Sequence, residues 1–141
     1  MGKWIGNYSM FRDPYSKSKD YMVEHEISYI TNSNYKLTIL PGFKTDGASV
    51  PRLFRWYISP FNGPWAPAAC LHDLMYRINY MQSRSYCDYL FKEALITSNI
   101  RLSMVYTIWL AVRLGGWIPW RINVDKEYGK QYFKSEFLGN K

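Results

Sequence analysis

The sequence predicts an α+β protein in which a small N-terminal β-hairpin or sheet packs on a mainly helical body. Two β-prone runs precede residue 49, helical periodicity begins near residue 50, and 48% of the residues are hydrophobic, enough for a core. The length of 141 residues matches one domain. We therefore expect a single domain over 1–141, β-rich over 1–49 and helical over 50–116, with an aromatic C-terminal tail over 117–141 that the pattern does not place.

The β-rich region contains one predicted hairpin. The runs HEISYI at 25–30 and YKLTILPGF at 35–43 are rich in β-prone residues. Between them lies TNSN, whose side chains favour turns. The segment DPYSKSKD at 13–20 is polar and predicts a loop.

Four helices are predicted after residue 50. Proline suits the first position of a helix, because its missing N–H has no partner there in any case. Pro51 thus begins a short helix, and Pro67 begins the second after a turn at 59–64. The fourth helix ends at the glycine pair 115–116. The predicted helices cover 51–58, 67–81, 83–99 and 101–116.

The net charge and the aromatic content indicate which classes of binding partner suit this protein. The net charge of +7, from 18 basic and 11 acidic side chains, favours an anionic partner such as lipid, nucleic acid or an acidic protein surface. The basic residues are scattered, so a nucleic-acid partner is not expected. The 13 Tyr and 6 Trp residues suit an interface or a membrane surface.

The sequence shows no targeting or membrane-spanning segment. The first residues, MGKWIGNYSMFRDPY, lack the apolar core of a signal peptide. The apolar run LSMVYTIWLAV at 102–112 is too short to cross a bilayer. We therefore expect synthesis in a cytoplasm and no transmembrane span.

The segment AACLHDLMYRINY at 68–80 carries the first candidate site. On a helix, His72 and Tyr76 share a stripe because they are four residues apart. Asp73 is turned by about 100° from His72, so the two side chains point into neighbouring sectors of one cleft. This arrangement suits a histidine that handles a proton beside a carboxylate that binds a cation or water. A core histidine beside a solvated carboxylate is the alternative.

Asp88 is the candidate partner of His72. On the next helix it shares the apolar stripe of Phe91 and Leu95. A carboxylate that points inward needs a partner, because an unpaired buried charge is costly. Bound to one ring nitrogen of His72, it would hold the histidine as a base. Alternatively, Ser85-x-x-Asp88 matches a capping box that begins the helix, and the spacing alone does not decide between the two.

The segment FKTDGAS at 43–49 is a candidate cation site. Asp46 offers a carboxylate, and Gly47 allows the backbone to present carbonyl oxygens, the mixture of ligands that calcium takes. A turn without metal is the alternative. Zinc is not expected, because the chain has only two histidines and two cysteines, without ligand spacing.

These motifs occur together in a known family. GFKTDGASVPRLF, then AACLHDLMY, a later aspartate and a helix ending in AVRLGG resemble the phage and prophage proteins with domain of unknown function 1353. The resemblance covers roughly residues 25–116 and implies no activity.

A second resemblance implies an activity. ACLHDLMYRINY resembles the catalytic helix of the prokaryotic secreted phospholipases A2, and TDGAS resembles their calcium-binding segment. SRSYCDYLFKEAL and YTIWLAVRLGG resemble two further helices of that family. The resemblance implies a phospholipase A2-like body with antiparallel catalytic helices.

The phospholipase resemblance also implies roles for single residues. His72 would be the base that activates water, Asp88 would orient it, and Tyr76 would brace Asp88. Three residues would bind calcium: Asp73, Asp46 and Gly47 through its carbonyl.

Two functions are therefore weighed. The first is a phage- or prophage-encoded, calcium-dependent lipid ester hydrolase that acts at an anionic membrane surface. The second is a non-catalytic structural or interaction protein of a virion or phage tail, with other virion proteins as partners. An inert protein on the same fold would use its aromatic surface for contact with those partners.

Overall fold

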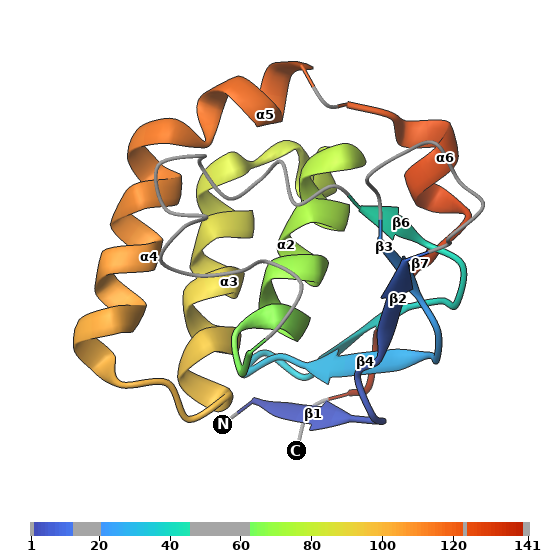
Figure 1. Cartoon of the computed structure of the whole chain (residues 1–141), viewed down its shortest axis with the longest axis horizontal. Helices are drawn as coiled ribbons and strands as arrows, with labels where there is room; N and C mark the ends of the chain where they lie inside the picture. Colours follow the sequence, from blue (N-terminus) through green and yellow to red (C-terminus); the bar gives the residue numbers. More distant parts are fainter. Residues whose placement is uncertain (1, 13–20, 46–62, 123, 140–141) are drawn as a thin grey trace.

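Two antiparallel sheets pack beside a layer of helices in the computed structural model (Figure 1). The structure describes residues 2–12, 21–45, 63–122 and 124–139. The larger sheet has four strands in the order β1-β4-β5-β7. These strands are β1 (Lys3–Ile5), β4 (Ile27–Ile30), β5 (Tyr35–Ile39) and β7 (Phe133–Phe137). The predicted α+β class is confirmed.

The smaller sheet has three strands, all from the first 45 residues. Its order is β2-β3-β6, and both pairs are antiparallel. Its strands are β2 (Met10–Arg12), β3 (Tyr21–Val23) and β6 (Lys44–Thr45). Val23 also donates its backbone N–H to the carbonyl of Phe43.

The predicted hairpin is confirmed as β4 and β5. Ile27 pairs with Ile39 at one end of the ladder, and Ile30 pairs with Lys36 at the other. Asn34 takes a left-handed conformation in the turn, with φ of 65°, which asparagine tolerates better than most residues. The predicted loop at 13–20 lies outside the described residues.

The C-terminal tail returns to the N-terminal sheet. After α5 (Trp117–Ile122) and α6 (Lys126–Lys130), strand β7 pairs antiparallel with β5, with Tyr35 opposite Phe137 and Ile39 opposite Phe133. The β-region is therefore larger than a small N-terminal hairpin, since its fourth strand comes from the other end of the chain.

The second, third and fourth predicted helices are present. They are α2 (Ala66–Arg77), α3 (Arg84–Thr97) and α4 (Leu102–Gly115), and they run antiparallel to their neighbours (Figure 1). Pro67 lies in the first turn of α2, as expected. The helix predicted at 51–58 lies outside the described residues, as does most of the turn at 59–64. None of the helices in the described part of the chain has the length and apolar character needed to span a bilayer.

The second helix is shorter than predicted. It ends at Arg77 instead of residue 81, and a short 3₁₀ helix, η1 (Tyr80–Gln82), follows it. Asn79 has a φ of 48°, which an α-helix does not allow. Its side-chain amide donates to the carbonyls of Tyr76 and Trp120, so these contacts accompany the end of the helix.

The core lies between the larger sheet and the helices α2 and α3. Glu93 of α3 ties the hairpin to this helix through two hydrogen bonds. The carboxylate oxygen Oε1 of Glu93 accepts a hydrogen bond from Tyr29 Oη at 2.8 Å and another from the backbone N–H of Asn32 at 2.7 Å. The largest fully buried side chains of the core include Tyr29, Leu37, Ile39, Phe43, Leu71, Leu74, Met75, Leu90, Phe91 and Leu95.

Candidate functional site

A buried network joins α2 to α3. His72 Nε2 lies 2.7 Å from Asp88 Oδ1, and Tyr76 Oη donates to the same oxygen at 2.5 Å. His72 and Asp88 are both 0% exposed. The helical stripe of α2 presents His72 and Tyr76 together, and α3 presents Asp88 toward them. The structure thus brings together the three residues that the sequence singles out for proton chemistry.

Two arginines complete the surroundings of Asp88. Arg113 Nη1, from α4, donates to Asp88 Oδ2 at 2.8 Å, and Arg84 Nη1 approaches it at 3.5 Å. Burial by itself raises the pKa of Asp88, but the hydrogen bonds from His72, Tyr76 and Arg113 lower it below the ordinary 3.8. Asp88 is therefore ionised at neutral pH.

Tyr76 stays protonated in this network. Burial raises the pKa of its hydroxyl, and the neighbouring charge of Asp88 raises it further. Because the hydroxyl keeps its proton, it can only donate to the carboxylate of Asp88. The contact therefore fixes the position of Asp88 and stabilises its charge.

The capping role considered for Asp88 is wrong. The residue that caps α3 is Ser83, whose Oγ accepts a hydrogen bond from the backbone N–H of Tyr86 at 3.2 Å. Asp88 lies within the second turn, and its oxygens bind side chains of other turns and helices. The buried carboxylate of Asp88 therefore has the hydrogen-bond partners that a buried charge needs.

The two ring nitrogens of His72 have different surroundings. Since an ionised Asp88 only accepts, the proton of a neutral imidazole belongs on Nε2, which leaves a lone pair on Nδ1. Nδ1 is buried and has no hydrogen-bond partner in the described part of the chain. The ring is packed between Tyr76, at 4.1 Å between centroids, and Phe91, at 4.4 Å. Nε2 is therefore held by Asp88, and Nδ1 is an acceptor without a partner among the described residues.

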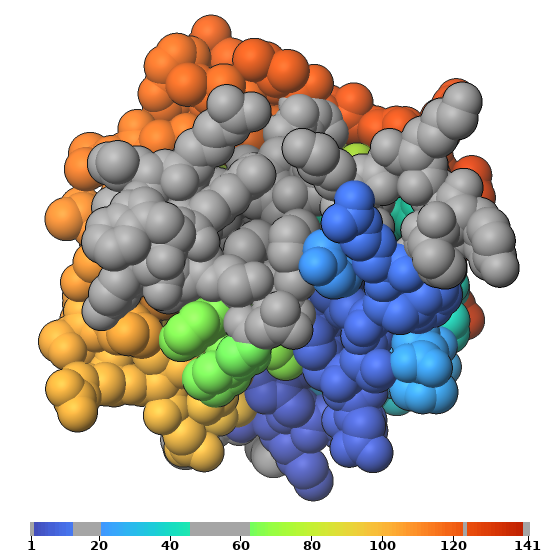
Figure 2. Space-filling view, in the orientation of Figure 1, coloured from blue at the N-terminus to red at the C-terminus, as the bar shows by residue number. Residues whose placement is uncertain are grey.

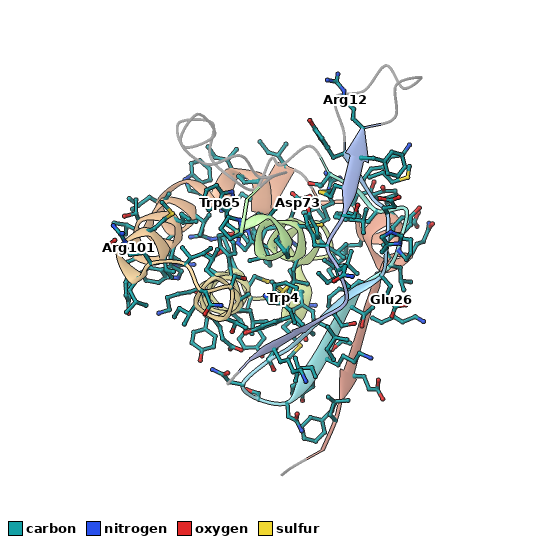
Figure 3. The ribbon with its side chains drawn as sticks, turned by 60° about the horizontal axis from the view of Figure 1, so that its bottom comes forward. Trp4, Arg12, Glu26, Trp65, Asp73 and Arg101 are labelled. Atoms are coloured by element: carbon teal, nitrogen blue, oxygen red, sulfur yellow. The ribbon has the colours of Figure 1, made fainter. Side chains whose placement is uncertain are left out.

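Asp73 lies on the side of α2 that faces the strands (Figure 3). Its Oδ2 accepts from Thr45 Oγ1 at 2.5 Å and from Arg77 Nε at 3.1 Å. Oδ1 accepts no hydrogen bond from the described residues. Thr45 is the last described residue before Asp46 and Gly47, which lie outside the described ranges. Among the described residues, Asp73 is thus a buried carboxylate whose hydrogen bonds all reach Oδ2.

The described residues do not by themselves form a metal site. Within 2–12, 21–45, 63–122 and 124–139, no three His, Cys, Asp or Glu side chains cluster as metal ligands would. The two cysteines, Cys70 and Cys87, are buried and unpaired. Burial raises the pKa of Cys87 to about 12, with a further contribution from Asp88, so it remains a thiol.

The sequence analysis did not predict several contacts of the site. Arg84 and Asp88 are four residues apart on one helix, as are Asp73 and Arg77, and this spacing is a usable signal for an ion pair. Arg113 has no such signal, because it reaches Asp88 from another helix. The arginines thus make Asp88 the centre of the network.

Fold and site together define an α+β protein with a buried histidine–aspartate–tyrosine network held by arginine. The model of the family described as Protein of unknown function (DUF1353) matches residues 21–112, well over half of the chain. The chain belongs to this family, and the matched range includes the whole buried network except Arg113. Comparisons with curated proteins and with solved structures each produce no match.

Proposed function

We propose that this protein is a phage- or prophage-encoded, phospholipase A2-like hydrolase of lipid esters, with calcium as its cofactor. The observation that carries the proposal is the asymmetry of His72. Its Nε2 is bound to Asp88, whereas its buried Nδ1 has no partner among the described residues. A general base needs this combination of one oriented nitrogen and one available lone pair.

In the proposed mechanism, His72 Nδ1 takes a proton from a water molecule as that water attacks the ester carbonyl. The ring then becomes positively charged while Nε2 still donates to Asp88. Asp88 stabilises this charge, and Tyr76 and Arg113 keep the carboxylate in place. When the tetrahedral intermediate collapses, the ester C–O bond breaks and His72 Nδ1 returns its proton to the leaving alcohol oxygen. Because His72 has no exposed surface, the reaction also requires that water and the ester reach Nδ1 when substrate binds.

Asp73 would be the calcium ligand of the described region. Calcium prefers oxygen ligands, and Oδ1 of Asp73 accepts no hydrogen bond from the described residues. Asp46 and Gly47 would supply the other protein ligands, and they follow directly after Thr45, which binds Asp73. When bound, calcium supplies positive charge that stabilises a developing negative oxygen.

The test is release of fatty acid from phospholipid vesicles at millimolar calcium. The His72→Gln variant should lose at least about 100-fold in rate, the usual contribution of a positioned base. The exposed second histidine offers a matched control, and His25→Gln should keep full activity. Asp73→Asn should lose both activity and calcium binding measured by calorimetry. A wild-type protein that releases no fatty acid, or a His72→Gln variant as active as wild type, would overturn the proposal.

A non-catalytic virion or tail protein is the second candidate, and the burial of the network favours it. His72 and Asp88 have no exposed surface, and the imidazole is packed between two aromatic rings. Buried polar networks can also serve to rigidify a core and to specify its packing. In that case His72→Gln would lower the melting temperature, and wild-type protein would release no fatty acid with any phospholipid tested.

A further inference from the structure

Helices α4 and α5 both carry exposed apolar side chains. Seven large apolar side chains in this segment remain between 45% and 73% exposed. Figure 1 shows both helices at the outside of the molecule, and Figure 2 shows α4 in orange at the left and α5 in darker orange along the top. We call these residues the α4–α5 surface: Leu102, Tyr106, Leu110, Leu114, Trp117, Ile118 and Ile122.

The spacing on α4 explains why the apolar side chains form one face. The four that lie on this helix, from Leu102 to Leu114, are spaced by four residues, which places them along one inclined row of the helix surface. The helix buries a different set of residues, which includes Val105, Ile108 and Val112. The exposed row is therefore additional to the packing of α4 in the domain, and exposed apolar patches of this kind mark interaction sites.

The charges along the same segment have one sign. Residues 101–122 contain three arginines and no aspartate or glutamate. Arg101 and Arg121 are exposed, at the two ends of the α4–α5 surface, whereas Arg113 is bound to Asp88. Arg121 also lies 6.0 Å from the ring centroid of Trp117. The surface is thus apolar along its length and positively charged at both ends.

We propose that the α4–α5 surface docks on an anionic phospholipid bilayer. Its apolar side chains would enter the boundary between headgroups and acyl chains, and Arg101 and Arg121 would contact lipid phosphates. Trp117 has the amphipathic ring that favours this boundary.

The single sign of charge argues against a second copy of the chain on this surface. Two such surfaces placed together would bring arginines toward arginines, with no acidic residue in 101–122 to compensate them. An anionic bilayer supplies the missing negative charge. Docking does not depend on hydrolysis at His72, so it goes beyond the proposed function.

The experiment measures binding to sedimented vesicles made from diether phospholipids, which have no ester to hydrolyse. Vesicles of diether phosphatidylglycerol and phosphatidylcholine are compared with vesicles of diether phosphatidylcholine alone. We expect binding to the anionic vesicles only, weakened by high salt because the arginine contacts are screened. The ether lipids keep this test separate from the hydrolysis assay, so either proposal can fail alone.

Two pairs of variants and two controls test the surface itself. Leu110→Gln with Leu114→Gln should lower the partition coefficient at least about tenfold, because two exposed apolar side chains are lost. Arg101→Gln with Arg121→Gln should lower it by about 25-fold, or about fivefold for each charge near an anionic surface.

The controls remove equivalent groups elsewhere. Arg12→Gln with Lys134→Gln removes the same net charge from exposed positions on β2 and β7, and Figure 3 shows Arg12 well separated from Arg101. Met81→Gln removes an exposed apolar side chain from η1. Each control should bind as wild type does.

Three results would overturn the docking proposal. The first is no binding of the wild type to anionic vesicles. The second is equal binding by the wild type and both pairs of variants. The third is a dimer in sedimentation equilibrium that the leucine pair abolishes while vesicle binding is unchanged, since a second copy would then occupy the surface. Circular dichroism of each variant verifies that it is folded before binding is compared.

Discussion

Asp88→Asn is the most informative single change, because it keeps the shape of the side chain and removes its charge. The wild-type carboxylate accepts from His72 and Tyr76 through Oδ1 and from Arg113 and Arg84 through Oδ2. An asparagine has only one acceptor oxygen. If that oxygen keeps the bonds to His72 and Tyr76, the amide N–H groups must face the arginine donors.

The expected loss in the free energy of unfolding follows from these contacts. A hydrogen bond to a charged group contributes about 1 kcal/mol more than a neutral one, and His72 and Tyr76 make two of them in a fully buried place. The side chains of Arg84 and Arg113 are 21% and 29% exposed, so water screens their attraction and its loss costs only about 1 kcal/mol. Together the free energy of unfolding should fall by about 3 kcal/mol, within the range for breaking a buried ion pair.

The assay is urea unfolding at pH 7, followed by circular dichroism and tryptophan fluorescence. Asp125→Asn is the control, because Asp125 caps α6 and an asparagine caps equally well. Its change should be within about 0.5 kcal/mol. A loss below about 1 kcal/mol for Asp88→Asn would refute the network as a major contribution to stability.

Three further predictions concern the same region. Because the pKa of Asp88 is lowered in the folded protein, its stabilisation is present above the ordinary 3.8 and is lost as the pH falls through the folded-state pKa. The difference in unfolding free energy between wild type and Asp88→Asn, measured by urea titration, should therefore be constant above about pH 5 and shrink below it; an unchanged difference at acid pH would contradict the assigned shift. Ser83→Ala should lower the unfolding free energy by about 1 kcal/mol through loss of the α3 cap, whereas Ser85→Ala should change it by less than about 0.5 kcal/mol, and the reverse order in thermal melts would restore the capping box. Gly116→Ala should destabilise the protein by about 1–3 kcal/mol, because the added Cβ would lie 2.7 Å from Tyr76 Oη and 2.3 Å from the carbonyl of Val112; a melting temperature equal to that of wild type would show that the chain shifts freely there.

The elements with strong local signals were predictable from the sequence. The hairpin β4–β5 follows from two β-prone runs around TNSN, and α2 from Pro67 and helical periodicity. Both signals come from residues close together in the chain. Faces were predictable for the same reason, since helical spacing alone places His72 beside Tyr76 and directs Asp88 inward with Phe91.

Only the tertiary structure decided the rest, because the remaining contacts join residues that are distant in the sequence. Strand β7 adds to β5 from almost 100 residues away, as the pairing of Ile39 with Phe133 shows. Arg113 reaches Asp88 from α4, and its sequence position carries no sign of this contact. Such pairings depend on which faces the packed helices and sheets bring together, whereas propensity and spacing act only within a few turns or one hairpin. The sequence therefore determined the hairpin, the main helices and the chemistry on their faces, whereas packing determined the remaining strands and which faces meet.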